Sequence, residues 1–272
     1  MSKGKNSVMK RVRRVALPAA VLALGLYFVP LLALFYVLCG LLDLSRHRNL
    51  TSELVWKYFT GNGILTWLLS PINLLADLFS KPNRVIYRLE DMPPEHRREI
   101  ETCVREFRAN GDRIKAHVQK SLAGSRRGML TFKWFNAPQS TELDIPAFRQ
   151  DFRFIKTIAV SVFNTRERTS WHFGPLRLTF RVLYNLDPID SREVFIEVDG
   201  KTHYWVDDPL FIFDDTVFHR SINDVDHVRY CLFMDIVRPN YAHAAFDMAV
   251  HTASAISSSF KRMFYKNWSF IR

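Results

Sequence analysis

Short strand-like runs fill the chain from Met129 to Val237, and they limit its possible folds more than any other feature. Turns with glycine, proline, asparagine or aspartate separate the runs, and the pair flanking Asp199-Gly200 has the pattern of a β-hairpin. An amphipathic helix over roughly residues 94–120, broken near Gly111, precedes them. This order predicts a mainly β fold, an antiparallel double-sheet jelly roll with supporting helices. The predicted strands cover residues 129–135, 155–163, 178–186, 193–198, 201–206, 210–213 and 230–237.

The N-terminal region contains an uncharged run from Val15 to Leu42, preceded by six lysines and arginines. A spanning helix needs about 20 apolar residues, so the run predicts a retained membrane helix. A cleaved secretory signal is the alternative, but its apolar core usually has about 7–15 residues and a small-residue cleavage pattern follows it. This run is longer and lacks that pattern.

A second apolar stretch, from Gly63 to Phe79, is interrupted by Pro71, Asn73 and Asp77. It fits a second span, a re-entrant segment or a helix in the membrane interface. The basic N-terminus favours a cytoplasmic start. One span would then place the large domain outside the cytoplasm, whereas two passes or a hairpin bent near Pro30 would return it inside.

The composition suggests the kind of partner. A formal charge of +11 and a pI near 9.7 favour anionic partners, such as an acidic membrane surface. No DNA- or RNA-binding motif is present, so nucleic acid is not predicted. The three cysteines are scattered and give no disulfide framework. We expect three parts: membrane-anchoring segments in 1–80, a jelly-roll domain with its leading helix in 81–240, and an amphipathic helix in 241–272. That last helix would dock on the barrel or lie in the membrane interface.

The residues with the clearest chemistry are His172, His219 and Arg229, which lie at the ends of strand-like runs. Two imidazoles on a β scaffold suit Fe(II), and a buried guanidinium suits a dicarboxylate. The common iron site adds a carboxylate two residues after the first histidine, but here that position is Gly174. The spacing thus leaves either a two-histidine iron site or a pair of structural histidines. The nearby Asp214 and Asp215 are expected to shape a turn or to hold an imidazole N–H.

Residues 155–240 resemble the aspartyl/asparaginyl β-hydroxylase family, whose iron is held by two histidines and no protein carboxylate. His172-Phe173-Gly174-Pro175 is similar to the family's His-x-Gly-Pro motif, and Phe213-Asp214-Asp215-Thr216 with His219 and Asn223 is similar to its second ligand-bearing segment. The resemblance implies that His172 and His219 bind iron. It also implies that Arg229 and Ser161 bind the distal carboxylate of 2-oxoglutarate, and that Arg181 holds another anionic group. Trp205 matches the family's tryptophan ahead of the Phe-Asp-Asp turn.

Two positions depart from the family pattern: Leu183 replaces a histidine that contacts the co-substrate, and Asp208 replaces a glycine. The family fold is a double-stranded β-helix of the jelly-roll or cupin type. Its cofactor is Fe(II), with 2-oxoglutarate and O2 as co-substrates. The run from Phe233 to Pro239, together with an N-terminal membrane segment, is similar to the lipid A hydroxylase branch.

This resemblance implies a membrane-anchored dioxygenase that hydroxylates a lipid acyl chain, with an anionic headgroup in its substrate. Its catalytic domain would face the cytoplasm at a bacterial inner membrane. A peptidyl aspartyl or asparaginyl hydroxylase and an inactive membrane-bound barrel are the alternatives.

Overall fold

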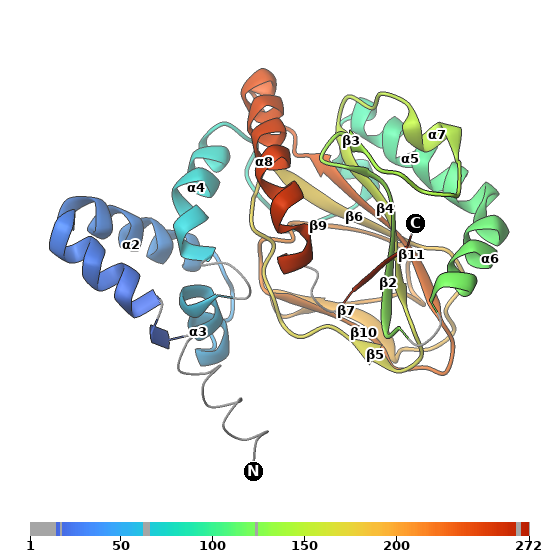
Figure 1. Cartoon of the computed structure of the whole chain (residues 1–272), viewed down its shortest axis with the longest axis horizontal. Helices are drawn as coiled ribbons and strands as arrows, with labels where there is room; N and C mark the ends of the chain where they lie inside the picture. Colours follow the sequence, from blue (N-terminus) through green and yellow to red (C-terminus); the bar gives the residue numbers. More distant parts are fainter. Residues whose placement is uncertain (1–14, 17, 62–65, 123–124, 265–267, 272) are drawn as a thin grey trace, which may run out of the picture.

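A computed structural model describes residues 15–16, 18–61, 66–122, 125–264 and 268–271 of the chain. Two β-sheets form a jelly roll, helices α5, α6 and α7 cover one side, and an N-terminal group of helices extends from the other (Figure 1). Except for one parallel pair, neighbouring strands are antiparallel. The predicted mainly β architecture is therefore confirmed.

The larger sheet has the order β1-β9-β6-β11-β4-β2-β12, and β3 pairs with β2. The smaller sheet has the order β5-β10-β7-β8. The bounds in the larger sheet are β1 (Ile86–Tyr87), β9 (Leu210–Phe213), β6 (Thr179–Asn185), β11 (Arg229–Val237), β4 (Ile155–Phe163), β2 (Arg127–Trp134), β12 (Ser269–Ile271) and β3 (Ala137–Pro138). In the smaller sheet they are β5 (Glu167–Arg168), β10 (His219–Asn223), β7 (Val194–Val198) and β8 (Lys201–Tyr204).

The predicted hairpin joins β7 to β8. Asp199 and Gly200 both have positive φ, 49° and 78°, which is the backbone of the tight turn that matches strand twist. Glycine adopts this region without steric cost, and aspartate tolerates it.

Alternating side chains of the larger sheet pack on its two faces. One face meets α5 (Pro94–Ala109), α6 (Gly111–Ser121) and α7 (Pro146–Arg149) in the main core. The predicted break of the leading helix at Gly111 is confirmed, and its predicted apolar face is fully buried at Ile100, Phe107, Ile114 and Val118. The opposite face, with Leu183 and Phe233, meets the smaller sheet in a second cluster.

The N-terminal helices are α2 (Pro30–Leu44), α3 (Ser52–Thr60), η1 (Thr66–Leu69) and α4 (Ser70–Leu78). Residues 18–28 are also helical, but Val29 leaves the helical conformation (φ −141°, ψ 62°). Proline disfavours a helical residue before it and has no N–H to donate, so the run bends at Pro30. The expected spanning helix over residues 15–42 is therefore not found. Within the described ranges, no helix combines the length and apolar character needed to cross a bilayer.

The C-terminal region differs in part from the prediction of one helix over 241–272. Helix α8 (His243–Phe264) docks on the barrel through Phe246 and Val250, which is the first of the two predicted placements. After it, Ser269–Ile271 form β12, parallel to β2. The short turn η2 (Leu89–Asp91) completes the set of elements.

Candidate active site

His172 and His219 lie side by side, with ring centroids 4.1 Å apart. Each backbone N–H donates to the carbonyl of the other residue at 3.0 Å, so an antiparallel bridge fixes both ligand segments. His219 begins β10, and His172 lies in the loop that runs beside it. The structure thus brings together two residues that are far apart in sequence, as a shared metal requires.

Both rings are held in one tautomer. Nδ1 of His172 lies 2.8 Å from the carbonyl of Ser170, and Nδ1 of His219 lies 2.8 Å from the carbonyl of Val217. A carbonyl only accepts, so each Nδ1 carries the proton and each Nε2 keeps its lone pair. Burial lowers the pKa of His172 to about 4 and that of His219 well below its usual value. Both rings are therefore neutral at physiological pH, the form that binds metal.

Gly174 occupies the position where the common iron site has its carboxylate. A Cβ atom added there would overlap the carboxylate of Asp215, whose backbone carbonyl accepts a 2.7 Å hydrogen bond from the Gly174 N–H. Burial, opposed by Arg181, raises the pKa of Asp215 to about 7. In the described part of the chain, no group of three His, Cys, Asp or Glu side chains could hold a metal ion. Among the described residues the arrangement therefore offers two imidazoles as protein ligands.

Arg229, at the start of β11, is a buried cation with incomplete hydrogen bonding. Its Nη2 donates to Oγ of Ser221 at 2.9 Å, while Nε and Nη1 have no partner among the described residues. Its guanidinium lies over the rings of Phe163 and Trp205, with 4.5 and 5.2 Å to the centroids. A buried donor without a partner is costly, so this site is built for an anion that the protein itself does not supply.

Two serines lie near this arginine, and the sequence indicated only one of them. Ser161 on β4 is buried on the same face of the larger sheet, but its hydroxyl donates to the carbonyl of Cys231 at 3.3 Å. Ser221 makes the direct contact. It lies two residues after His219 on one face of β10, which places it about 7 Å from that ligand by strand rise. Ser221 therefore links the arginine to the histidine pair.

Arg181 on β6 points to the same interior, but acids already compensate its charge. Its Nη2 lies 2.8 Å from Asp215 and its Nε donates to Asp235 at 2.7 Å, with the ring of Phe233 below it. Its expected role in holding an anion of the co-substrate or substrate stays a prediction. To bind such an anion, Arg181 would have to lose its contact with Asp215 or Asp235.

Asp214 does not hold an imidazole N–H. It shapes the turn before His219 through Thr216, and its carboxylate pairs with Arg46 and Arg177. Arg177 is fully buried and also pairs with Asp43 of α2 and Asp77 of α4. Sequence reasoning missed this cluster, since its members come from distant segments. It joins the N-terminal helices to the ligand-bearing turn.

An aromatic cluster makes a second connection between these helices and the histidines. Phe173 and Phe218, each adjacent to a ligand histidine, pack with Tyr58 of α3. Trp171 stacks on Phe218, and its carbonyl accepts a hydrogen bond from Lys57. Residues of helix α3 thus contact both segments that carry the histidines.

Part of the interior beside the histidines is apolar, next to the charged groups of Arg181, Asp215 and Asp235. Phe213 meets the His219 ring edge to face at 5.2 Å, and Leu183, the residue that replaces the family histidine, packs in the same cluster as Phe211 and Phe233. Such a lining favours a hydrocarbon over a charged substrate.

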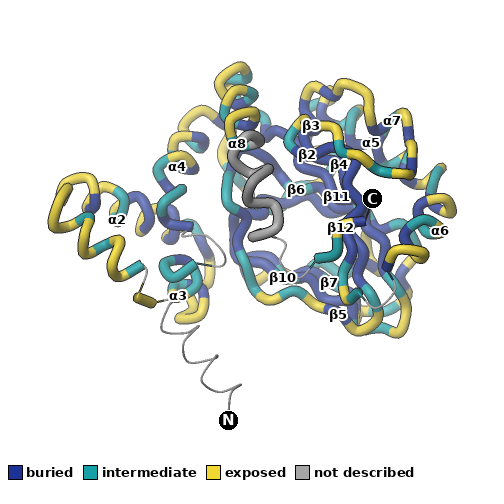
Figure 2. Tube along the Cα trace, in the orientation of Figure 1, coloured by how far each residue is buried: buried dark blue, intermediate teal, exposed yellow. Residues whose placement is uncertain are grey.

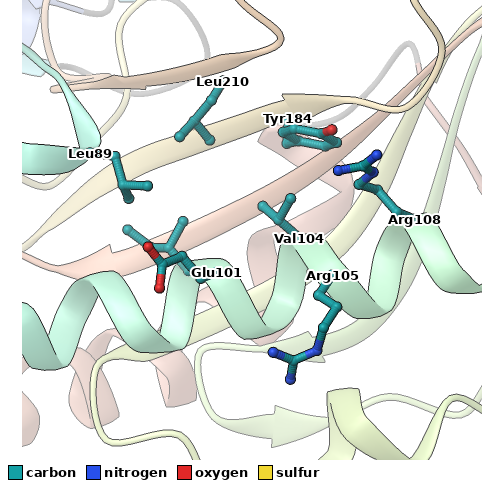
Figure 3. A pocket seen from close by; sticks show the side chains of 8 residues that line it. Leu89, Glu101, Val104, Arg105, Arg108, Tyr184 and Leu210 are labelled. Carbon is teal, nitrogen blue, oxygen red and sulfur yellow. The ribbon is translucent and has the colours of Figure 1, made fainter.

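A pocket of about 490 Å³ lies elsewhere, on the outer face of the larger sheet against α5 (Figure 3). Tyr184 lines it, and Tyr184 points to the face of β6 opposite to Arg181 and Leu183. The pocket contains none of the predicted site residues. Its lining residues are Leu89, Ile100, Glu101, Val104, Arg105, Arg108, Tyr184 and Leu210.

Comparisons with known proteins agree with the predicted family. A family model described as aspartyl/asparaginyl β-hydroxylase matches residues 135–239, which include both histidines and Arg229. A curated relative, the ornithine lipid ester-linked acyl 2-hydroxylase of Rhizobium tropici, is 30% identical over 93 residues, which are 34% of this chain and 33% of the relative. The chain thus matches about a third of that relative's length.

Solved structures of low identity also align. One is a 2OG-Fe(II) oxygenase family oxidoreductase from Burkholderia pseudomallei, with 14% identity, a TM-score of 0.30, and coverage of 46% of this chain and 78% of that one. Another is a cupin domain from Bordetella pertussis, with 14% identity, a TM-score of 0.26, and coverage of 41% and 96%.

Proposed function

We propose that this chain, whose residues 135–239 belong to the aspartyl/asparaginyl β-hydroxylase family, is an Fe(II)- and 2-oxoglutarate-dependent dioxygenase that hydroxylates a lipid acyl chain. One observation carries the proposal. Two neutral imidazoles that share a backbone bridge lie near a buried arginine whose Nε and Nη1 have no partner among the described residues.

The residues present fit the iron. His172 and His219 would hold it through their Nε2 atoms, because their Nδ1 atoms are bound to backbone carbonyls. When bound, Fe(II) supplies O2 activation coupled to the oxidation of 2-oxoglutarate to succinate and CO2. The bridge between the two backbones keeps the rings in place before metal arrives.

Arg229 fits the distal carboxylate of 2-oxoglutarate. Ser221 accepts one N–H of Nη2, so a carboxylate can accept from the second N–H of Nη2 together with either Nε or Nη1, neither of which has a partner among the described residues. Ser161 lies on β4, the strand that pairs with the Arg229 strand β11, and adds a second hydroxyl on the same face of the sheet. The keto-acid end would then reach toward the histidines.

An acyl chain is the substrate that the interior favours. Phe213 lies against the His219 ring, and the histidine of the family's Arg-x-His pattern is Leu183 here, which packs in the apolar cluster. Arg181 is already paired with Asp215 and Asp235, so it offers little to a charged peptide side chain. The lipid-modifying name of the curated relative supports the same substrate class.

We further propose that the protein works at a membrane with an anionic lipid headgroup as part of its substrate. The basic N-terminus and the exposed apolar helices support this placement. The cytoplasmic face of a bacterial inner membrane would supply Fe(II) and 2-oxoglutarate, so we place the catalytic domain there.

The test measures two products. Purified protein with Fe(II), 2-oxoglutarate and lipid extract should form succinate, and mass spectrometry should find one added oxygen on an acyl chain. The variant H172A should lose at least about 100-fold in turnover, since one of two protein ligands is removed. The matched control H251A, at an exposed position on α8, should retain full activity.

The alternatives give different results. A hydroxylated aspartyl or asparaginyl peptide with unchanged lipid would replace the lipid substrate by a peptide. No succinate under any condition would identify an inactive barrel. An H172A variant as active as the parent would refute the assignment of the iron ligands.

A further inference from the structure

The N-terminal helical hairpin has the most exposed apolar surface of the described chain. The helical residues 18–28 and α2 run in opposite directions from the bend at Pro30, and Gly25 lies close to Ala33 (Figure 1). The burial colouring shows that the hairpin projects away from the barrel and is exposed along most of its length (Figure 2). Within the hairpin, the most exposed large side chains are Leu31 (84%), Tyr27 (80%), Phe28 (71%), Leu42 (62%) and Leu24 (58%).

This surface is apolar all round the hairpin. From Val15 to Leu42 there is no charged residue and no Ser, Thr, Asn, Gln or His. An interface for another protein or a second copy is normally one apolar face with a polar rim. A helix that is apolar on every side suits a hydrocarbon surrounding.

The length of the hairpin matches one half of a bilayer. The 11 helical residues 18–28 rise about 16 Å, and the 15 residues of α2 rise about 22 Å. The hydrocarbon core of a bilayer is about 30 Å thick, so one leaflet accounts for about 15 Å. The bend at Pro30 returns the chain to the side from which it entered.

We propose that residues 18–28 and α2 form a hairpin that enters a single leaflet of a bilayer with anionic headgroups. The six lysines and arginines among residues 1–14 directly precede it, without any acidic residue. Basic side chains next to an apolar insertion favour acidic lipid headgroups. A bilayer therefore complements the hairpin in both polarity and charge.

The base of the hairpin is rigidly joined to the histidine site. Asp43, at the end of α2, pairs with the buried Arg177 and accepts a 2.8 Å hydrogen bond from Tyr58. Arg46, three residues on, donates to Asp214 in the turn before His219. An inserted hairpin would hold the site at a fixed distance from the membrane surface. That consequence for acyl-chain delivery rests on the proposed function, but the insertion itself does not.

Vesicle flotation tests the insertion without reference to activity. Full-length protein should float with phosphatidylglycerol vesicles, and less with neutral phosphatidylcholine vesicles. In the triple variant Y27S/F28S/L31S the partition coefficient should fall at least about 100-fold, because each large apolar side chain contributes more than a factor of about ten on leaving water. The matched control V206S changes an exposed apolar residue of the barrel and should float like wild type.

The depth of insertion can be measured at the hairpin tip. The variant L31C accepts a thiol-reactive environment-sensitive dye selectively, because Cys39, Cys103 and Cys231 are buried. We expect an apolar emission and no reaction with a membrane-impermeant thiol reagent on either side of the vesicle. Reaction from the far side would mean that the hairpin crosses the bilayer and would overturn the single-leaflet assignment.

Other outcomes separate the possibilities. A triple variant that floats like wild type would overturn the proposal. So would wild-type protein that ignores vesicles and instead forms a dimer that the triple variant loses in light scattering. Flotation with the predicted dependence but no succinate would sustain the hairpin and refute the enzymatic function.

Discussion

Two buried arginines, Arg177 and Arg229, have opposite surroundings. Arg177 is fully buried and pairs with the carboxylates of Asp43, Asp77 and Asp214. Burial alone would lower its pKa, but these acids hold the pKa of Arg177 above its usual value. Arg229 is 3% exposed, has two nitrogen atoms without partners in the described chain, and burial lowers its pKa.

The difference shows how charge compensation separates a structural cation from a ligand-binding one. A buried charge is tolerated only with partners. The partners of Arg177 are within the protein, where they join α2 and α4 to the turn before His219. Arg229 has aromatic rings and one serine, so its compensating charge is expected from a ligand. Substitutions of the two arginines should therefore affect different properties.

The largest expected effect is on stability. The variant R177M should lose about 3–5 kcal/mol of the free energy of unfolding, because it leaves Asp43 and Asp214 buried with too few cations. Urea denaturation at neutral pH measures the loss. The control R192M removes an exposed arginine that pairs with Asp207 at 2.9 Å, and it should cost less than about 1 kcal/mol. If R177M and R192M lose the same free energy of unfolding, the buried ion pairs of Arg177 contribute no more to stability than an exposed pair does.

Arg229 should give the reverse pattern. The variant R229M should be at least as stable as wild type without ligand, since it removes a buried cation with unpartnered N–H groups. Its kcat/KM for 2-oxoglutarate should fall at least about 30-fold, because a buried charge-assisted pair is lost. The variant R229K keeps the charge but not the forked geometry, and its kcat/KM should lie between those of wild type and R229M. A destabilised R229M with unchanged kcat/KM would make Arg229 a structural residue.

The pH dependence should distinguish the buried histidines from ordinary ones. Burial lowers the pKa of His172 to about 4, so protons should compete little with metal above about pH 5. We expect metal affinity to change less than about threefold between pH 8 and 5.5, as measured by anaerobic Fe(II) titration. An unperturbed histidine pair, with pKa values near 6.5, would already lose affinity markedly in this range.

The lowered pKa of His172 also determines whether the metal-free protein gains or loses stability as the pH falls. Between pH about 6.5 and 4 an unfolded histidine binds a proton that folded His172 does not. The unfolded state then binds more protons, so metal-free protein should lose stability as the pH falls through this window. The variant H172A should show a shallower loss.

The sequence predicted the apolar parts of the fold and missed the polar or very short ones. The bounds of β4 and β9 agree with the predicted runs, because their residues are apolar and turn residues flank them. Strand β10 was not predicted, since four of its five residues are polar: His219 and Ser221 lie on the face toward the site, and Arg220 lies on the other face and pairs with Glu197. Strand β12 has three residues, and only its distant pairing with β2 makes it a strand. The sequence predicted a spanning helix over residues 15–42 and kept a hairpin bent near Pro30 as an alternative, and local geometry at Val29 and Pro30 divides the run there.

At the site, motif spacing indicated His172, His219 and Arg229, and the fold brings them to one end of the barrel. Arg177 could not be found in the same way. Its partner Asp43 lies 134 residues away in sequence, and no short motif records such a contact. A single serine such as Ser221 also carries no local signal until the strand that holds it is known.

The smallest expected effect compares the two serines near Arg229. The resemblance assigned assistance of this arginine to Ser161, whereas the structure gives the direct hydrogen bond to Ser221. Loss of one hydrogen bond is worth about 0.5–1.5 kcal/mol, so S221A should raise the KM for 2-oxoglutarate by about 2–10-fold with little change in kcat. The variant S161A should change this KM less, because its hydroxyl is bound to the carbonyl of Cys231. If S161A has the larger effect, Ser161 must turn toward the co-substrate when it binds, and Ser221 then serves only to hold the empty guanidinium.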